Sequence, residues 1–159
     1  MQISPQDTGS GMTVSSAYSR DSLRQTYSAA WHKRLAGLPL SSLEALISDV
    51  IALHPEYQAL IADSERAQAF EAETTGSSEN PFMHLGLHLA VREQVVIDRP
   101  AGVRDLHLSL CATLSDAHRA DHVLMQALGE TLWEAQRSGQ APDESKYLAR
   151  ARAAQRFGM

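Results

Sequence analysis

The chain has 159 residues, of which 43% are hydrophobic, 21% charged and 6% aromatic, and its formal net charge is −5. This length fits one domain, and the composition is typical of a folded globular protein rather than a disordered one. Because nucleic-acid-binding domains are usually basic, the acidic balance argues against a nucleic-acid partner. The single cysteine, Cys111, excludes an intramolecular disulfide and a metal site made only of cysteines.

The N-terminal segment 1–16 is polar and rich in serine, glycine and threonine, and we expect it to be a disordered tail. It lacks the basic and apolar regions of a signal peptide. No apolar run in the chain approaches the roughly 18 residues that a membrane span needs. We therefore expect a cytoplasmic protein that does not associate with membranes.

Segment 17–159 is expected to form one helical domain. Apolar residues recur at helical spacing from Leu23 to Leu35, and Gly37 and Pro39 end this first helix. No later stretch shows sustained alternation of apolar and polar residues, and the chain has no Asn-Gly or Asp-Gly hairpin signal. The predicted fold is therefore all-α, a single-domain bundle of five or six helices.

A second helix is expected to follow Ser41, which lies three residues before Glu44 in the form of a capping box. This helix should break at His54, because the residue before a proline disfavours the helical conformation. A short helix over 56–62 is expected next. The long polar loop 63–80 then follows, and loops of this length are usually either functional or simply solvated.

The remaining helices are expected over 81–96, 101–114, 116–138 and 142–157. Asn80 before a proline is a strong start for the first of them, with the asparagine as cap and the proline in the first turn.

Two pairs of histidines lie on these predicted helices, each pair four residues apart: His84 with His88, and His118 with His122. This spacing puts both members of a pair on one helix face, where they can chelate one ion. Seven histidines in a chain of this length would give about 0.3 such pairs by chance. Both pairs also lie in the first two turns of their helices.

The two pairs are expected to meet. If consecutive helices alternate in direction, both helix starts lie at one end of the bundle, and the helix that ends at His54 reaches the same end. Each histidine face becomes apolar further along its helix, so the pairs should face the interior or a cleft. The predicted metal ligands are His54, His84, His88, His118 and His122.

Two carboxylates are assigned as outer partners that orient the imidazoles rather than bind the metal. Asp121 adjoins His122 and follows His118 by three residues. Glu93 lies nine residues after His84, which points it to the opposite helix face and makes it a poor direct ligand. A donor set rich in histidine suits zinc, with nickel, cobalt and copper as alternatives.

No catalytic residue is predicted, because the chain has no His-Glu-x-x-His motif to supply a general base. The alternative interpretation has no metal: the histidines bond to backbone or side chains, and the protein is a non-catalytic helical interaction module or a homo-oligomer. Trp133 and Phe157 are candidates for such a contact. His32 and His107 are expected to cap helices or to be solvated.

Several segments together resemble a known family, the bacterial domain of unknown function 1841. These segments are Pro39-Leu with Leu43-Glu44, His54-Pro-Glu-Tyr57, the run from Asn80 to Gln94, and Leu128-Gly-Glu-Thr-Leu-Trp-Glu-Ala-Gln-Arg137. The resemblance covers about residues 17–150 and implies a small, helical, cytoplasmic bacterial protein. It implies no activity. The five histidines and Glu93 match positions associated with the family's motifs.

Overall fold

The computed structural model describes residues 20–70 and 80–157, and the predicted tail 1–16 lies outside them. All regular secondary structure in the described residues is helical, which confirms the all-α prediction. The helices are α1 (Arg20–Leu35), α2 (Ser42–Ala52), α3 (Pro55–Ala62), α4 (Ser64–Ala69), α5 (Pro81–Ile97), α6 (Val103–Leu114), α7 (Ala117–Ser138) and α8 (Glu144–Arg156).

The prediction of five or six helices is wrong, because the described residues contain eight. Of these eight, only α4 was not expected as a helix, because it lies inside the predicted loop 63–80. The Asp63 side chain accepts a hydrogen bond from the Arg66 backbone N–H and begins α4. Residues 71–79 of that loop lie outside the described residues.

The end of α4 is set by a contact from a distant part of the chain. Arg24 of α1 is 3% exposed, and its Nη1 donates hydrogen bonds to the carbonyl oxygens of Ala67 (3.0 Å) and Phe70 (2.7 Å). The same guanidinium lies 4.2 Å from the centroid of the Phe82 ring in α5. The carbonyl groups that end α4 are therefore satisfied by tertiary contacts that are not visible in the local sequence.

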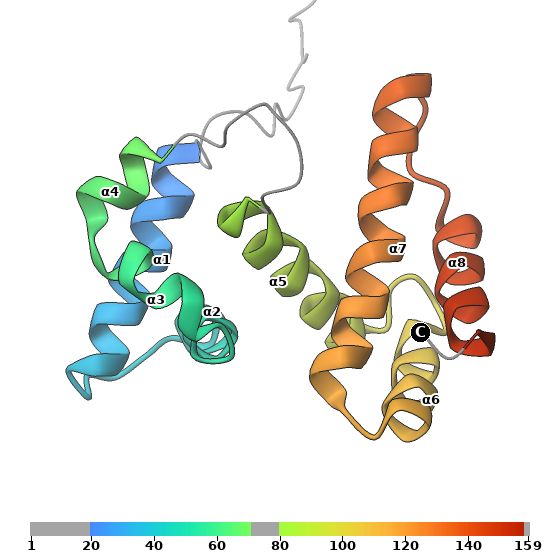
Figure 1. Cartoon of the computed structure of the whole chain (residues 1–159), viewed down its shortest axis with the longest axis horizontal. Coiled ribbons are helices and arrows are strands. Elements are labelled where there is room, and N and C mark those ends of the chain that lie inside the picture. Colours follow the sequence, from blue (N-terminus) through green and yellow to red (C-terminus); the bar gives the residue numbers. More distant parts are fainter. Residues whose placement is uncertain (1–19, 71–79, 158–159) are drawn as a thin grey trace, which may run out of the picture.

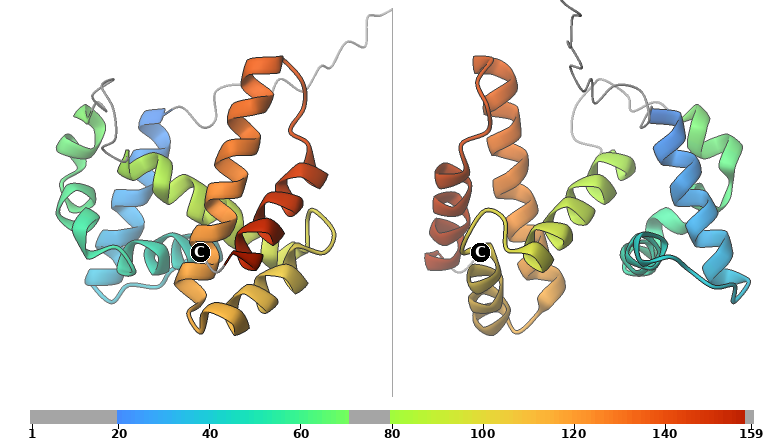
Figure 2. Two further views of the ribbon diagram at one scale, coloured as in Figure 1. Left: turned by 45° about the vertical axis from the view of Figure 1, so that its right-hand side comes forward. Right: turned by 180° about the vertical axis from the view of Figure 1, so that it is seen from behind.

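The helices form two groups, with α5 between them. Helices α1 to α4 lie on one side and α6 to α8 on the other (Figure 1), and views from other directions show the same division (Figure 2). Each group has its own cluster of buried apolar side chains. Helix α5 contributes Leu85 to the first cluster and Val91 to the second, so it joins the two. No helix in the described residues is both long and apolar enough to cross a membrane.

Local capping fixes where the two histidine-bearing helices begin. The Asn80 side chain accepts hydrogen bonds from the backbone N–H groups of Phe82 and Met83, and a proline occupies the first turn of α5. The Asp116 side chain accepts in the same way from the N–H groups of His118 and Arg119 at the start of α7. His118 and His122 therefore lie in the first two turns of α7, as predicted, whereas His84 lies in the second turn of α5 and His88, its eighth residue, begins the third.

Candidate metal centre

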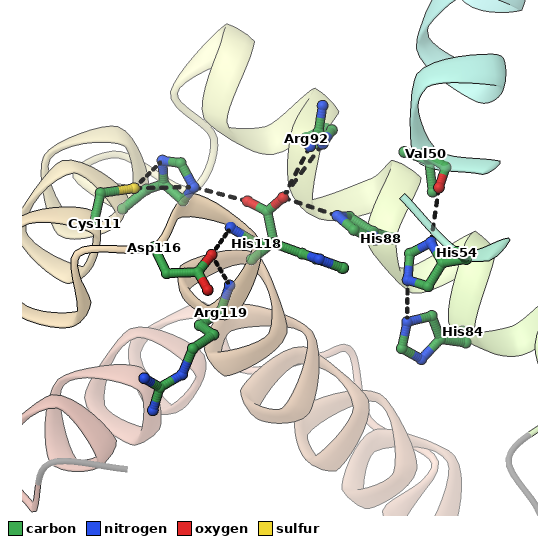
Figure 3. Close-up of polar contacts among 11 residues, drawn as sticks. Val50, His54, His84, His88, Arg92, Cys111, Asp116, His118 and Arg119 are labelled. Carbon is green, nitrogen blue, oxygen red and sulfur yellow. Dashed lines mark hydrogen bonds and ion pairs between the residues drawn. The ribbon is translucent and has the colours of Figure 1, made fainter. Parts of the chain in front are cut away.

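Histidines from three parts of the fold converge at the junction between the two helix groups. His54 lies at the turn between α2 and α3, His88 is on α5, and His118 and His122 are on α7. Each offers one ring nitrogen, and these four atoms all lie within 4.8 Å of one another. Figure 3 shows His54, His84, His88 and His118 side by side where the helices meet. We refer to His54, His88, His118 and His122 below as the histidine cluster.

His54 is held by its own turn. It is 2% exposed, its Nδ1 lies 2.7 Å from the carbonyl oxygen of Val50, and its ring stacks on Tyr57 with the planes 9° apart. Only a protonated Nδ1 can donate to that carbonyl, and in the neutral ring Nε2 then carries a lone pair. This Nε2 atom lies 2.9 Å from Nε2 of His84. Because two lone pairs repel each other, a proton or a cation must lie between these two nitrogens.

His88 is oriented in a similar way by a carboxylate. Its ring is fully buried, and Nε2 donates to Oδ2 of Asp121 at 2.8 Å. Nε2 therefore carries a proton, and in the neutral ring the lone pair is on Nδ1. Within the described residues this Nδ1 atom is buried and has no hydrogen-bond partner.

Two further ring nitrogens of the cluster are also buried and unpaired within the described residues. The Nε2 atoms of His118 and His122 are buried and have no hydrogen-bond partner within the described residues. Leaving a buried polar atom unpaired costs free energy, and most such atoms in folded proteins have a partner. Three unpaired nitrogens in one cluster fit an ion shared by the rings, because one cation would satisfy all of them together.

The protonation of the cluster also fits a cation. Burial, followed by the charges of the neighbouring histidines, lowers the pKa of His122 to about 4. Burial and the charges of His54 and His88 lower the pKa of His118 as well. Both rings are therefore neutral at pH 7, which is the form of imidazole that binds a metal.

Asp121 is a buried carboxylate that bonds to three side chains around the cluster. It is 3% exposed, its two oxygens accept from Nε2 of His88 and Nε2 of His107 at 2.8 Å each, and Nε of Arg92 lies at 3.3 Å. Burial alone would raise the pKa of Asp121. The hydrogen bonds from His107 and His88 and the charge of Arg92 outweigh burial and hold this pKa well below its ordinary value. The carboxylate is therefore ionised and fixes the orientation of His88.

The other predicted residues are placed as follows. His84 lies beside His54 but outside the histidine cluster as defined above. Asp121 accepts hydrogen bonds from His88 on α5 and His107 on α6, rather than from the histidines beside it on α7. Glu93 is exposed and has no contact with the cluster within the described residues. Nε2 of His32 lies 2.6 Å from the carbonyl oxygen of Ala62, at the end of α3, as expected of a capping residue.

Sequence reasoning missed two residues that hold Asp121, although each carried a signal. His107 lies on the apolar face that Val103 and Leu110 form on α6, so its ring had to face the interior and needed a polar partner there. Arg92 follows His88 by four residues and therefore shares its helix face.

A family model described as a domain of unknown function (DUF1841) matches residues 19–153 of the chain. A search among curated proteins finds no match, and a search among solved structures finds none either.

Proposed function

The chain belongs to the DUF1841 family, and we propose that it binds a divalent transition-metal ion through His54, His88, His118 and His122. The observation that carries this proposal is that three of these four histidines each have a buried ring nitrogen without a hydrogen-bond partner in the described residues, in a cluster whose four ligand atoms lie within 4.8 Å of one another. A cluster that was purely structural would be expected to pair these atoms with each other or with the backbone.

The donor set favours particular metals. Neutral imidazoles suit zinc, nickel, cobalt and copper, whereas magnesium and calcium prefer oxygen ligands. We propose zinc first, with nickel, cobalt and copper as alternatives. Four protein ligands would complete a tetrahedral zinc site of the structural kind.

His84 is proposed as a fifth ligand. Two nitrogens bound to one ion at about 2.05 Å and at right angles are about 2.9 Å apart, whereas tetrahedral ligands are about 3.3 Å apart. The 2.9 Å between Nε2 of His84 and Nε2 of His54 therefore fits neighbouring ligands of an ion with five or six ligands. The number of bound ligands distinguishes a site that includes His84 from one that does not.

The test is elemental analysis of the untagged full-length protein, purified without added metal. We expect close to one transition-metal ion per chain. The variant His122→Gln should lose most of it, because the cluster loses a ligand atom. The matched control is His32→Gln, which changes a histidine that lies outside the cluster at the end of α3 and should keep the metal. Circular dichroism of both variants checks that they fold.

Cobalt substitution gives a second readout that does not need a variant. The intensity of the visible absorption bands separates four-coordinate cobalt from five- or six-coordinate cobalt, and so tests whether His84 binds. A parent protein that contains no metal, and whose Tm is the same with and without zinc, nickel, cobalt or copper, would overturn the proposal. Equal metal content in His122→Gln and His32→Gln would overturn it as well.

A further inference from the structure

A groove lies next to the histidine cluster and has His122 in its wall. It has a volume of about 510 Å³ and runs between α7, α8 and the end of α6. Ala127 of α7 and Ala153 and Ala154 of α8 are among its lining residues, and their side chains are short. The volume is within the range of pockets that hold small organic ligands.

His122 belongs both to the histidine cluster and to the wall of the groove. Nε2 is buried among the other histidines, whereas Nδ1 has no hydrogen-bond partner within the described residues and is not among their buried unpaired atoms. A ligand histidine usually donates its second N–H to a carbonyl or carboxylate oxygen. His54 donates to the carbonyl oxygen of Val50 and His88 to Asp121, but His122 has no such acceptor in the described chain. An acceptor in the groove would complete the pattern.

Arg119 adds a positive charge at the same end of the groove. It precedes His122 by three residues on α7 and lines the groove, and Figure 3 shows its side chain pointing away from His118. Its guanidinium forms no hydrogen bond or ion pair in the part of the chain that the structure describes, and the residue is exposed. Such a cation is available to bind an anion.

The far end of the groove is different, because its charges are already paired. Arg150 donates to Glu134 at 2.5 Å, and its Nε lies 3.7 Å from Glu130. Glu130 follows Arg119 by eleven residues, which is about 16 Å along α7. Apolar side chains line the space between, including Val123, Ala127 and Ala153. One end of the groove therefore favours an anion, and the middle favours a hydrocarbon chain.

We propose that this groove binds an amphipathic carboxylate of the medium-chain fatty-acid class. The carboxylate accepts hydrogen bonds from Arg119 and from the Nδ1–H group of His122, and the alkyl chain lies along Val123 and Ala127. This inference rests on the proposed metal site, because a metal on Nε2 of His122 places the ring proton on Nδ1, where it can be donated. Metal and carboxylate should therefore strengthen each other's binding.

The experiment is calorimetric titration of the metal-loaded full-length protein with octanoate. Octan-1-ol and octylamine are the matched probes, since they keep the chain but replace the anion with a neutral or a positive group. The variant Arg119→Gln removes the proposed partner of the carboxylate. Arg152→Gln is its control, because it makes the same change of charge at an exposed position of α8 that does not line the groove. The metal content of each sample is measured separately.

We expect octanoate to bind at least about tenfold more tightly than octan-1-ol or octylamine, and Arg119→Gln to lose about tenfold or more. Arg152→Gln should bind octanoate as the parent does, and both variants should keep their metal. The groove proposal would be overturned if octanoate and octan-1-ol bound with equal affinity, or if the two arginine variants bound octanoate equally well. Either result would leave the metal site unaffected, provided that the measured metal content is close to one ion per chain. Octanoate affinity that is the same with and without metal would overturn the role of His122.

Discussion

Replacing Asp121 with asparagine tests how the histidine cluster is held. Asparagine has nearly the same shape as aspartate, but it has no charge and offers one oxygen in place of two. The native carboxylate accepts from both His88 and His107 at 2.8 Å. The asparagine oxygen can keep one of these bonds, and its amide group then faces the other N–H donor.

The expected loss of stability follows from these contacts. A hydrogen bond to a charged group contributes about 1.5–3 kcal/mol. The Arg92 side chain is 29% exposed, so water screens its ion pair with Asp121 and the pair adds little. We therefore expect Asp121→Asn to lower the free energy of unfolding by about 2–4 kcal/mol. In a chain of this size that lowers Tm by about 5–15 °C.

The same change should weaken metal binding by about 10–100-fold, because the orientation of His88 and the position of its proton are no longer fixed. Urea denaturation measures the stability, and competition with a chromophoric chelator measures the affinity. Asp105→Asn is the control, since Asp105 is exposed on α6 and has no contact with the cluster in the described residues. If Asp121→Asn is destabilised but binds metal as tightly as Asp105→Asn does, Asp121 has only a structural role and the reasoning is refuted.

Two further predictions concern the histidines of α7 and the cap of α5. Burial lowers the pKa of His122 to about 4 and also lowers that of His118, so between about pH 6.5 and pH 4 the unfolded metal-free chain binds protons that the folded chain does not. The free energy of unfolding of the metal-free protein should therefore fall as the pH drops through this window and be level just above it. Urea denaturation at several pH values should show a shallower fall in His122→Gln than in the parent. An identical fall in the two proteins would contradict the prediction. Asn80→Ala should lower the free energy of unfolding by about 1 kcal/mol, because two backbone N–H groups of α5 lose their acceptor. Its metal affinity should change less than that of Asp121→Asn, and thermal unfolding with and without metal checks both points.

The helix face that carries each histidine pair was predictable, because local residues control where a helix starts. The expectation that both helix starts lie at one end of the bundle is wrong: Leu87 of α5 lies against Gly129 of α7, whereas Arg92, further along α5, reaches Asp121 near the start of α7. Asn80 and Asp116 each satisfy two N–H groups of the helix that follows them, and these bonds set the first residue of α5 and of α7. A pair spaced by four residues then has a known face. The proline after His54 ends α2 at a definite residue in the same way.

Other features depend on packing between distant segments and could not be read from the chain in advance. The partners of Asp121 are determined by how α6 packs on α7, because His107 reaches it across that contact. The end of α4 depends on Arg24, more than 40 residues earlier in the chain. The groove depends on how α7 and α8 pack against each other. Periodicity predicts which face of a helix is apolar, but it does not say which neighbour that face will meet.

The position of the cluster between two apolar cores makes the proposed ion important for the fold as well as for ligand binding. His54 comes from the group formed by α1 to α4, whereas His118 and His122 come from the group formed by α6 to α8. Where a single core would place apolar side chains, this junction has buried imidazole nitrogens that lack hydrogen-bond partners in the described chain. Such groups stabilise a fold only when their lone pairs are satisfied. The proposed metal ion would satisfy them and link both groups to α5, so the attachment of the two groups to each other should be tightest when the metal is bound.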